Sequence, residues 1–359
     1  MTVGTAPPLR PRGMGELLDQ TIRIYRRNFL KFIGIVALVQ IPISLLGLLS
    51  GLLATSGFSN PQFGGDFPAN PDVTDLFGLT YFLGIAIGLI VGVLSLIAIQ
   101  GVAAAVIARC VADDYQGVSV GIVDAYRRIA SFGGILLTAF LLVIGIGIVL
   151  FIWMFIPCVG WLTGPGIFVF YRWVFIPLIA PIIVFERQDT LQSLRRVWDL
   201  TRQRFWWLLG FVLILTIFSQ LIVVGPALLA TFGFTLLTGS TLTNPDITLT
   251  LIQSFVQLVT SLLVLPITLI AMTLLYFDLR VRLEGFDLAV QSATLSAEAP
   301  LELSELTAQA PRASQEKLLT RGDLGNFSLI TLGIVALYAL IFALLGAAAM
   351  AIMGVASGF

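Results

Sequence analysis

Arginine supplies most of the side chains in this sequence that could bind a ligand. The 359 residues include 20 Lys and Arg, 20 Asp and Glu, two Cys and no His. Without histidine there is no ordinary Ser-His-Asp or Cys-His arrangement and no histidine metal site. The sequence also has no GxxxxGK[ST] phosphate loop and no CxxC motif. We therefore expect no enzyme activity, no cofactor and no metal, and the chemistry left to consider is the binding of anions by guanidinium groups.

Arginines share one face of a predicted helix in three segments. In MGELLDQTIRIYRRNF at residues 14–29, polar residues from Glu16 to Arg27 recur at i, i+3, i+4, i+7, i+10 and i+11. Adding 176 to each number gives a similar face within residues 190–207, and residues 119–132 are a looser copy. The candidate contacts to anions or lipid headgroups on these faces are Arg23, Arg26, Arg27, Arg127, Arg128, Arg195, Arg196, Arg202 and Arg204.

Each of these helices precedes two long apolar stretches and is suited to lie in the plane of a membrane interface. The apolar stripe of the first copy is Leu18, Ile22, Tyr25 and Phe29, which we expect to enter the acyl boundary. Near an anionic leaflet, each exposed basic residue gains about 1 kcal/mol. Two interpretations stay open, a topology anchor and a sensor of headgroups.

Membrane spans are the elements that must position these helices. The chain is 58% hydrophobic and 11% charged, with a mean hydropathy of +0.99, whereas about 25% of residues in soluble domains are charged. A span needs about 20 mostly apolar residues. Seven stretches qualify: 30–54, 79–108, 133–155, 166–185, 205–226, 249–276 and 327–356. The predicted fold class is an all-α polytopic transmembrane bundle of about seven spans, with short amphipathic interfacial helices on the cytoplasmic side in three repeated units.

The distribution of charge predicts the orientation of these spans. A cytoplasmic N-terminus places every basic residue except Arg172 on one side. The three predicted outer loops, near 55–78, 156–165 and 239–248, contain Asp but no Lys or Arg. The positive-inside rule then puts the N-terminus in the cytoplasm and the C-terminus outside. The formal net charge of zero argues against a nucleic-acid partner.

The repeated segments also predict the domain organisation. Three units, each an interfacial helix followed by a helical hairpin, cover 14–117, 118–188 and 189–287. The transmembrane domain over 14–287 is expected to follow a disordered cytoplasmic tail over 1–13 and to precede a cytoplasmic linker over 288–326 and a C-terminal transmembrane helix over 327–359.

Two of the units end in similar sequences. IARCVADDYQG at 107–117 aligns with FDLRVRLEGFD at 277–287, which matches Arg109 with Arg280 and Asp113 with Glu284. An Arg and an acid four residues apart share a helix face, although this order of the two residues is the weaker one. We interpret both segments as helix ends at the inner face.

Three stretches carry a resemblance to a known family. GELLDQTIRIYRRNF near the start, LRRVWDLTRQRFWWLLG at 194–210 and LLYFDLRVRLEGFDL at 274–288 resemble the membrane domain in front of some bacterial glycerophosphodiester phosphodiesterases, and its stand-alone relatives of unassigned function. The resemblance covers about residues 14–288. It implies a bacterial inner-membrane protein near lipid or envelope metabolism. The attached enzyme has catalytic histidines, and this sequence has none, so the activity is not implied.

Arg172 lies inside the fourth predicted span. A charge at mid-membrane costs about 2.5–3.5 kcal/mol on insertion scales. Arg172 falls about 21 Å along a helix from Glu186, in the outer third of the membrane if Glu186 marks the inner interface. Its side chain either reaches the outer headgroups beside Tyr171 and Trp173, or faces the bundle interior to bind an anionic ligand such as a lipid phosphate.

Small residues predict where helices approach closely. Gly84, Gly88 and Gly92 form a doubled GxxxG pattern in the second span, and we expect this ridge to pack within the bundle. In the seventh span the small residues with the same spacing are Ala343, Ala347 and Ala351, which are candidates for contact with another subunit.

These features predict a non-catalytic integral inner-membrane protein that scaffolds or regulates membrane lipid or protein components through its basic interfacial helices. The expected partners are lipids of the anionic inner leaflet and a membrane protein bound to helix 327–356, with no nucleic acid. Two alternative functions stay open. One is a facilitator that moves a lipid or small anion by means of Arg172, and the other is an accessory subunit of a larger membrane complex, docked through the C-terminal helix.

Overall fold

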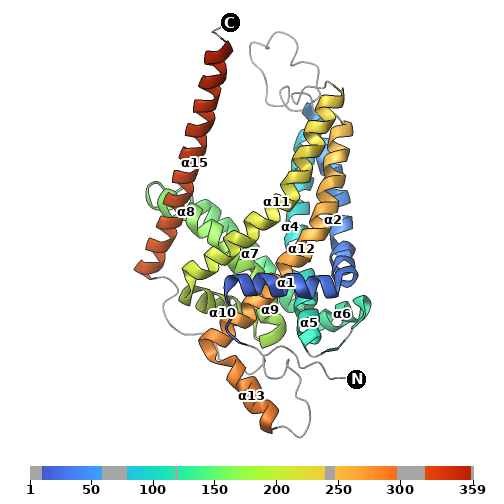
Figure 1. Ribbon diagram of the computed structural model, residues 1–359, viewed down its shortest axis with the longest axis vertical. Helices are drawn as coiled ribbons and strands as arrows, with labels where there is room; N and C mark the ends of the chain where they lie inside the picture. Colours follow the sequence, from blue (N-terminus) through green and yellow to red (C-terminus); the bar gives the residue numbers. More distant parts are fainter. Residues whose placement is uncertain are drawn as a thin grey trace. The chain divides into compact units, whose positions relative to one another are not determined.

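The computed structural model describes residues 10–58, 79–115, 117–118, 120–238, 247–296 and 320–356, and all regular structure within them is helical (Figure 1). Within these described ranges, seven helices are long and apolar enough to cross a membrane, which confirms the all-α fold class and the seven predicted spans. These helices are Phe29–Ala54, Tyr81–Tyr115, Ile122–Trp153, Val159–Glu186, Phe205–Phe234, Thr250–Glu284 and Arg321–Leu344. The chain is an integral membrane protein by these features.

Several spans are built from more than one helical segment. The first half of the chain forms α1 (Met14–Arg27), α2 (Phe29–Phe58), α4 (Leu79–Ser95), η2 (Leu96–Ala103), α5 (Ala104–Tyr115), α6 (Ile122–Ile129), η3 (Ala130–Phe132) and α7 (Gly133–Trp153). The second half forms α8 (Val159–Phe170), η4 (Tyr171–Phe175), α9 (Ile176–Glu186), α10 (Thr190–Gln203), α11 (Phe205–Thr238), α12 (Ile247–Glu284), α13 (Phe286–Ser296) and α15 (Arg321–Ala356). The segments η2 and η4 are π-helical turns, which often mark functional positions.

The chain divides into two compact units rather than three repeats and a tethered helix. Unit 1 comprises Met1–Phe140 and Pro177–Ala313, and unit 2 comprises Leu141–Ile176 and Ser314–Phe359. The second predicted repeat, 118–188, is therefore split between the two units. Its middle part groups with the C-terminal helix, a pairing that no sequence repeat indicates.

The core of unit 1 lies around α5, α9 and α12. The side chains of Leu178, Ile179, Ile182 and Ile183 in α9 are fully buried. At the end of α9, the ring of Phe185 stacks on that of Tyr276 in α12, with ring centroids 5.6 Å apart and an interplanar angle of 9°. These contacts fix where α9 ends relative to α12.

Helix α1 lies across the long helices of unit 1, as an interfacial helix would (Figure 1). It buries Leu17, Thr21, Ile24 and Tyr25 against the bundle. The predicted apolar stripe is therefore divided, because Tyr25 is buried whereas Ile22 and Phe29 are each 39% exposed. The helix has one face toward the bundle, one apolar face outward and one polar face.

Helices α1 and α10, which carry the sequence repeat, bury side chains at equivalent positions. Adding 176 to the four buried residues of α1 gives Ser193, Val197, Leu200 and Thr201, all of which are buried in α10. Both helices thus use the same register against the bundle. This agreement supports the sequence repeat even though the compact units differ from the predicted ones.

In unit 2, α8 packs closely against α15. A Cβ atom on Gly166 would overlap the carbonyl oxygen of Phe327, and the backbone N–H of Gly166 donates to Thr331 Oγ1 at 2.9 Å. Phe170 meets Phe327 edge to face at 5.8 Å. The C-terminal helix therefore contacts its own chain, and it begins at Arg321 instead of residue 327.

Further along α15, the large hydrophobic side chains from Leu332 to Leu344 are exposed. Ala343 is exposed with them, whereas the side chains of Ala347 and Ala351 lie outside the described residues. Docking of this helix on another protein stays a prediction.

The structure describes parts of the predicted tail and linker. Arg12 donates its backbone N–H to Asp278 of α12, and α13 occupies the first part of the predicted linker. Residues 1–9 and 297–319 lie outside the described residues, as do the four acidic residues of the predicted outer loops. The predicted disorder of 1–13 stays a prediction.

The glycine ridge of α4 faces α2 at two of its three positions. A Cβ atom on Gly84 would lie 2.5 Å from the backbone nitrogen of Ala54, and Ser50 Oγ donates to the carbonyl oxygen of Gly84 at 2.7 Å. A Cβ atom on Gly88 would lie 2.9 Å from Ser50 Oγ, whereas one on Gly92 would meet nothing within 4 Å. The ridge packs within unit 1, as predicted, through Gly84 and Gly88.

We expect Gly84→Ala to lower the stability of the protein by about 1–3 kcal/mol, because the added methyl group must push α4 away from α2. Gly92→Ala is the matched control and should be neutral or slightly stabilising, because its methyl group meets open space and alanine favours a helix. Thermal unfolding of both variants in the same detergent measures the difference. Equal midpoints for the two variants would contradict the close contact.

Candidate functional site

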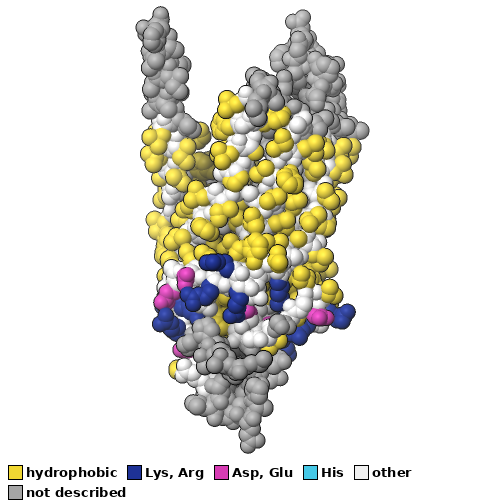
Figure 2. Space-filling model, turned by 45° about the vertical axis from the view of Figure 1, so that its right-hand side comes forward, with side chains coloured by type: hydrophobic (Ala, Val, Ile, Leu, Met, Phe, Trp, Pro, Cys, Tyr) yellow, Lys and Arg dark blue, Asp and Glu magenta, His cyan; other side chains and the backbone are white. Residues whose placement is uncertain are grey.

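The charged side chains of unit 1 gather where its spans leave the hydrophobic surface (Figure 2). This charged end consists of α1, α6 and α10 together with the ends of α5, α9 and α12. It contains arginines of two kinds, those held inside by carboxylates and those exposed. The distinction decides which of the predicted arginines a ligand can reach.

Arg196 belongs to the first kind, since it is only 6% exposed. Its Nε atom donates to Glu186 Oε2 at 3.0 Å, and its Nη2 atom pairs with Glu284. Arg280 also binds Glu284, at 3.0 Å, and Tyr276 donates to Glu186 Oε1 at 3.2 Å. The prediction that Arg196 contacts headgroups fails here, because its guanidinium is enclosed by carboxylates from α9 and α12.

The N-terminal residues add a second internal network. The backbone N–H of Arg12 donates to Asp278 Oδ1 at 2.7 Å, and Asp278 also accepts from Arg282 Nε at 2.7 Å. Arg282 donates to the backbone oxygen of Arg12 as well. The Nη1 atom of Arg12 donates to the hydroxyl of Tyr115 at 2.9 Å, and Gln20 donates to the same hydroxyl. The start of the chain is thereby joined to α5 and α12.

Arg27 has a structural partner too. Its Nε atom donates to Asp114 Oδ1 at 3.1 Å, and the neighbouring Asn28 donates to the same oxygen at 2.9 Å. The end of α1 is thus attached to the end of α5. The side chain of Arg27 is nevertheless 62% exposed, so its outer face stays accessible.

The remaining predicted arginines are more exposed than Arg196. Arg23 pairs with Asp19 at 3.1 Å within α1, and Arg127 pairs with Asp124 at 3.8 Å within α6, both with strongly exposed side chains. Such exposed pairs hold an arginine weakly. Arg26 and Arg128 are exposed, and Arg195, Arg202 and Arg204 are partly exposed. These side chains form a basic surface at the charged end.

One open pocket of about 520 Å³ at this surface is lined by three arginines that come from three elements. Arg109 comes from α5, Arg128 from α6, and Arg187 from the link between α9 and α10. The other lining residues are Ile129, Ser131 and Phe132. None of these described lining residues is acidic.

Asp113 holds two of these arginines from behind the pocket. It is 4% exposed and lies 3.7 Å from Arg109 Nε and 3.5 Å from Arg128 Nη1. Both distances exceed those of good charge-assisted hydrogen bonds, so Asp113 attracts the two guanidinium groups by charge. The predicted pair of Arg109 with Asp113 is present, as is its counterpart between Arg280 and Glu284.

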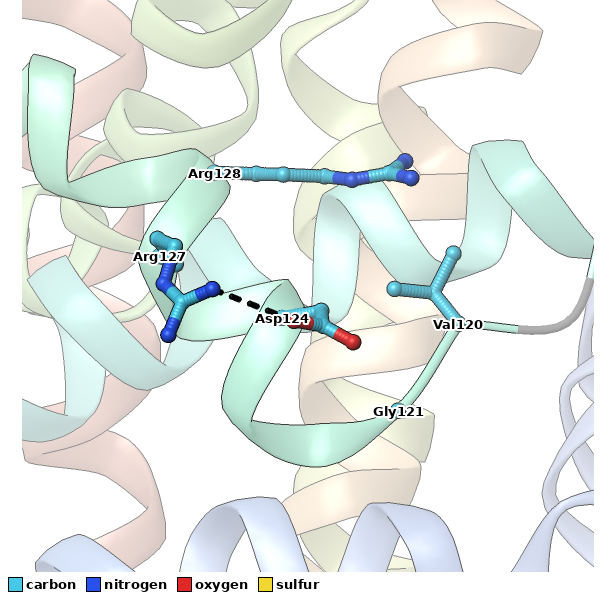
Figure 3. Close-up of a pocket in the computed structure, with 5 residues that line it drawn as sticks. All are labelled: Val120, Gly121, Asp124, Arg127 and Arg128. Atoms are coloured by element: carbon cyan, nitrogen blue, oxygen red, sulfur yellow. Dashed lines mark ion pairs between the residues drawn. The ribbon is translucent and has the colours of Figure 1, made fainter.

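A neighbouring pocket of about 400 Å³ has a different character (Figure 3). It is lined by Val120, Gly121, Asp124, Arg127 and Arg128. Figure 3 shows Arg127 turned toward Asp124, whereas Arg128 extends away from this pair. The carboxylate of Asp124 makes this second pocket less suitable for an anion than the three-arginine pocket.

Arg172 lies in unit 2, in the π-helical turn η4. Its guanidinium carbon is 5.3 Å from the centroid of the Trp173 ring, a cation–π distance. Within the described part of the chain no carboxylate pairs with it. The adjacent Tyr171 donates to the backbone oxygen of Val143 at 2.5 Å. Its role as an anion site therefore stays a prediction.

Arg109 and Arg187 are not among the predicted ligand contacts, because neither lies on the repeated helix face. A signal for Arg187 does exist in the sequence. It follows Glu186 at the end of α9, whereas Gly285 follows the last acidic residue of α12, Glu284. Arginine thus occupies a position where glycine is the usual residue.

The described residues contain no group of three His, Cys, Asp or Glu side chains arranged to hold a metal ion. No family model, curated protein or solved structure matches the sequence. The resemblance to the membrane domain of glycerophosphodiester phosphodiesterases therefore depends on the sequence motifs alone.

We expect Arg196→Met to destabilise the protein by about 3–5 kcal/mol, because it leaves buried carboxylates with reduced compensation. Arg23→Met is the matched control and should change stability little, since Arg23 is exposed. Adding Glu186→Gln to Arg196→Met should recover part of the loss, because it removes one buried charge. Thermal unfolding in detergent measures all three. If Arg196→Met and Arg23→Met unfold at the same temperature, the buried network does not hold the helices together.

Proposed function

We propose that this protein is a non-catalytic integral membrane protein that recruits anionic phospholipids to its charged end through the exposed arginines of α1 and α6 and the partly exposed arginines of α10. The observation that carries the proposal is the separation of arginines into two classes. Arg196 and Arg12 are buried and enclosed by structural partners, whereas Arg23, Arg26 and Arg127 are exposed. Exposed guanidinium groups beside a hydrophobic belt meet the phosphates of a leaflet.

The form of α1 supports this proposal. Ile22 of α1 and Phe29 at the start of α2 are exposed, whereas Leu17 and Tyr25 of α1 are buried against the bundle. An outward apolar face beside an outward basic face is the arrangement of a helix that lies at a membrane interface. A role in scaffolding or regulating other membrane components would follow from the local enrichment of anionic lipid.

We further infer that the charged end faces the cytoplasm of a bacterial cell. The positive-inside rule supports this orientation, because the basic residues of unit 1 collect at this end. The membrane-domain resemblance supports the bacterial inner membrane as the location. Transport by means of Arg172 and docking through α15 are less favoured, since Arg172 already meets Trp173 and α15 already packs on α8.

The proposal is tested by the lipid that surrounds the protein. In nanodiscs made from equal amounts of phosphatidylglycerol and phosphatidylcholine, we expect the lipids retained by the protein in native mass spectrometry to be enriched in phosphatidylglycerol. Replacing Arg23, Arg26 and Arg127 together by Gln should roughly halve this enrichment or reduce it further, because each cation contributes to the local potential. High salt should weaken it as well.

The matched control replaces the same three residues by Lys. This variant should retain the enrichment, because a general electrostatic attraction depends on charge and not on guanidinium geometry. The proposal fails if the Gln variant is as enriched in phosphatidylglycerol as the unmodified protein.

A further inference from the structure

The three-arginine pocket differs from the rest of the basic surface in how its cations are gathered. Arg109, Arg128 and Arg187 come from segments far apart in the sequence, yet they line one concave site of about 520 Å³. A pocket of this size lies within the range of small-molecule sites. Converging guanidinium groups repel one another unless a carboxylate or an anionic ligand compensates them. Asp113 supplies one negative charge, from behind Arg109 and Arg128.

The backbone of Arg187 supplies an independent argument. Its φ angle is +51°, in the left-handed region that residues other than glycine seldom adopt. At the corresponding helix end, Gly285 has φ +63°. Both residues donate their backbone N–H to the carbonyl four residues earlier, at 3.3 Å for Arg187 and 3.1 Å for Gly285. The two helix ends have the same geometry, and glycine would suit both.

Arginine at position 187 is therefore strained, whereas glycine would adopt the same backbone geometry without strain. Conformational strain of this kind is found at functional sites, where a particular side chain is needed at a strained position. The side chain of Arg187 has no ion pair within the described part of the chain. Its neighbour Glu186 does not supply one, because the carboxylate of Glu186 is bound by Arg196 and Tyr276.

We propose that Arg109, Arg128 and Arg187 form a specific binding site for the phosphate of a phosphomonoester. Three guanidinium groups in one pocket, whose described lining includes no acidic side chain, favour a ligand with two negative charges over one with a single charge. A phosphomonoester carries about −1.5 to −2 at neutral pH, whereas a phosphodiester carries one charge. Ser131 in the lining offers a hydroxyl donor, and Ile129 and Phe132 offer apolar surface to the group that bears the phosphate.

The same chemistry is present in a lipid headgroup that ends in phosphate and in a soluble phosphomonoester. This site rests on the proposed function in one respect, since a lipid ligand would come from the anionic lipid recruited to the charged end. Binding at this site differs in mechanism from lipid recruitment at the charged end. The site requires a fixed geometry of guanidinium groups, whereas recruitment requires only positive charge.

The test measures binding of methyl phosphate to the full chain in uncharged detergent, by titration calorimetry. We expect saturable binding to the unmodified protein and binding about tenfold weaker or more for Arg187→Gly, which removes charge-assisted hydrogen bonds. Arg187→Lys should bind more weakly than the unmodified protein, because lysine lacks the planar fork of donors. Dimethyl phosphate, a diester, should bind more weakly than methyl phosphate.

The Arg187→Gly variant also controls for misfolding. Glycine adopts a positive φ angle without strain, so its thermal unfolding temperature should equal or exceed that of the unmodified protein. Arg321→Gln is a second control, because Arg321 is exposed and does not line this pocket. It should leave methyl phosphate binding unchanged.

The source of the phosphate is decided by competition. If phosphatidic acid in nanodiscs displaces methyl phosphate, the ligand is a lipid; if it does not, the ligand is a soluble phosphomonoester. Either result supports the site. Equal binding of methyl phosphate by Arg187→Gly and by the unmodified protein overturns it, as does equal binding of the diester. Loss of phosphatidylglycerol enrichment is measured on the separate Gln variant of α1 and α6, so the site and the proposed function can fail independently.

Discussion

A charge at the end of a membrane span must meet an opposite charge, water or a headgroup, because apolar surroundings compensate it poorly. The end of α9 in unit 1 shows the first solution. Glu186 is 2% exposed there and is bound by Arg196 from α10 and by Tyr276 from α12. Removing Arg196 or Glu186 would leave the charge of the other without its buried partner. This mutual dependence fixes the ends of α9 and α12 and the position of α10, and with them the surface on which the exposed arginines stand.

The spans and the repeat between α1 and α10 could be predicted from the sequence, since both follow from local patterns, whereas three of the four residues that α1 buries lie outside the predicted apolar stripe. Lipid requires long uninterrupted apolar helices, and a helix that packs on one side buries every third or fourth residue. The state of Arg196 could not be predicted in this way. Periodicity places it on a polar face, but it cannot show that this face meets Glu186 and Glu284, which are 10 and 88 residues away. Long-range partners decide whether a polar face is solvated or enclosed.

The division into compact units has a similar origin. The sequence repeats predict three similar hairpins, but the second of these is interrupted by the contact of α8 with α15. That contact depends on Gly166, whose lack of a side chain lets the backbone of Phe327 approach and lets Thr331 accept its N–H. Glycines are common in the spans, and a single one does not show which helix approaches it. Packing partners in a membrane are chosen by shape, which hydropathy does not record.

The buried network adjoins the three-arginine pocket because Glu186, which belongs to the network, is followed directly by Arg187, which lines the pocket. Because Arg196 and Tyr276 hold the carboxylate of Glu186, the last residue of α9 has a fixed position, and α10 begins only four residues later at Thr190. Arg187 lies in this short link, where its positive φ angle ends α9. Its side chain lines the pocket that Arg109 and Arg128 share. An arginine that headgroups cannot reach, Arg196, thus positions one that a phosphate can reach.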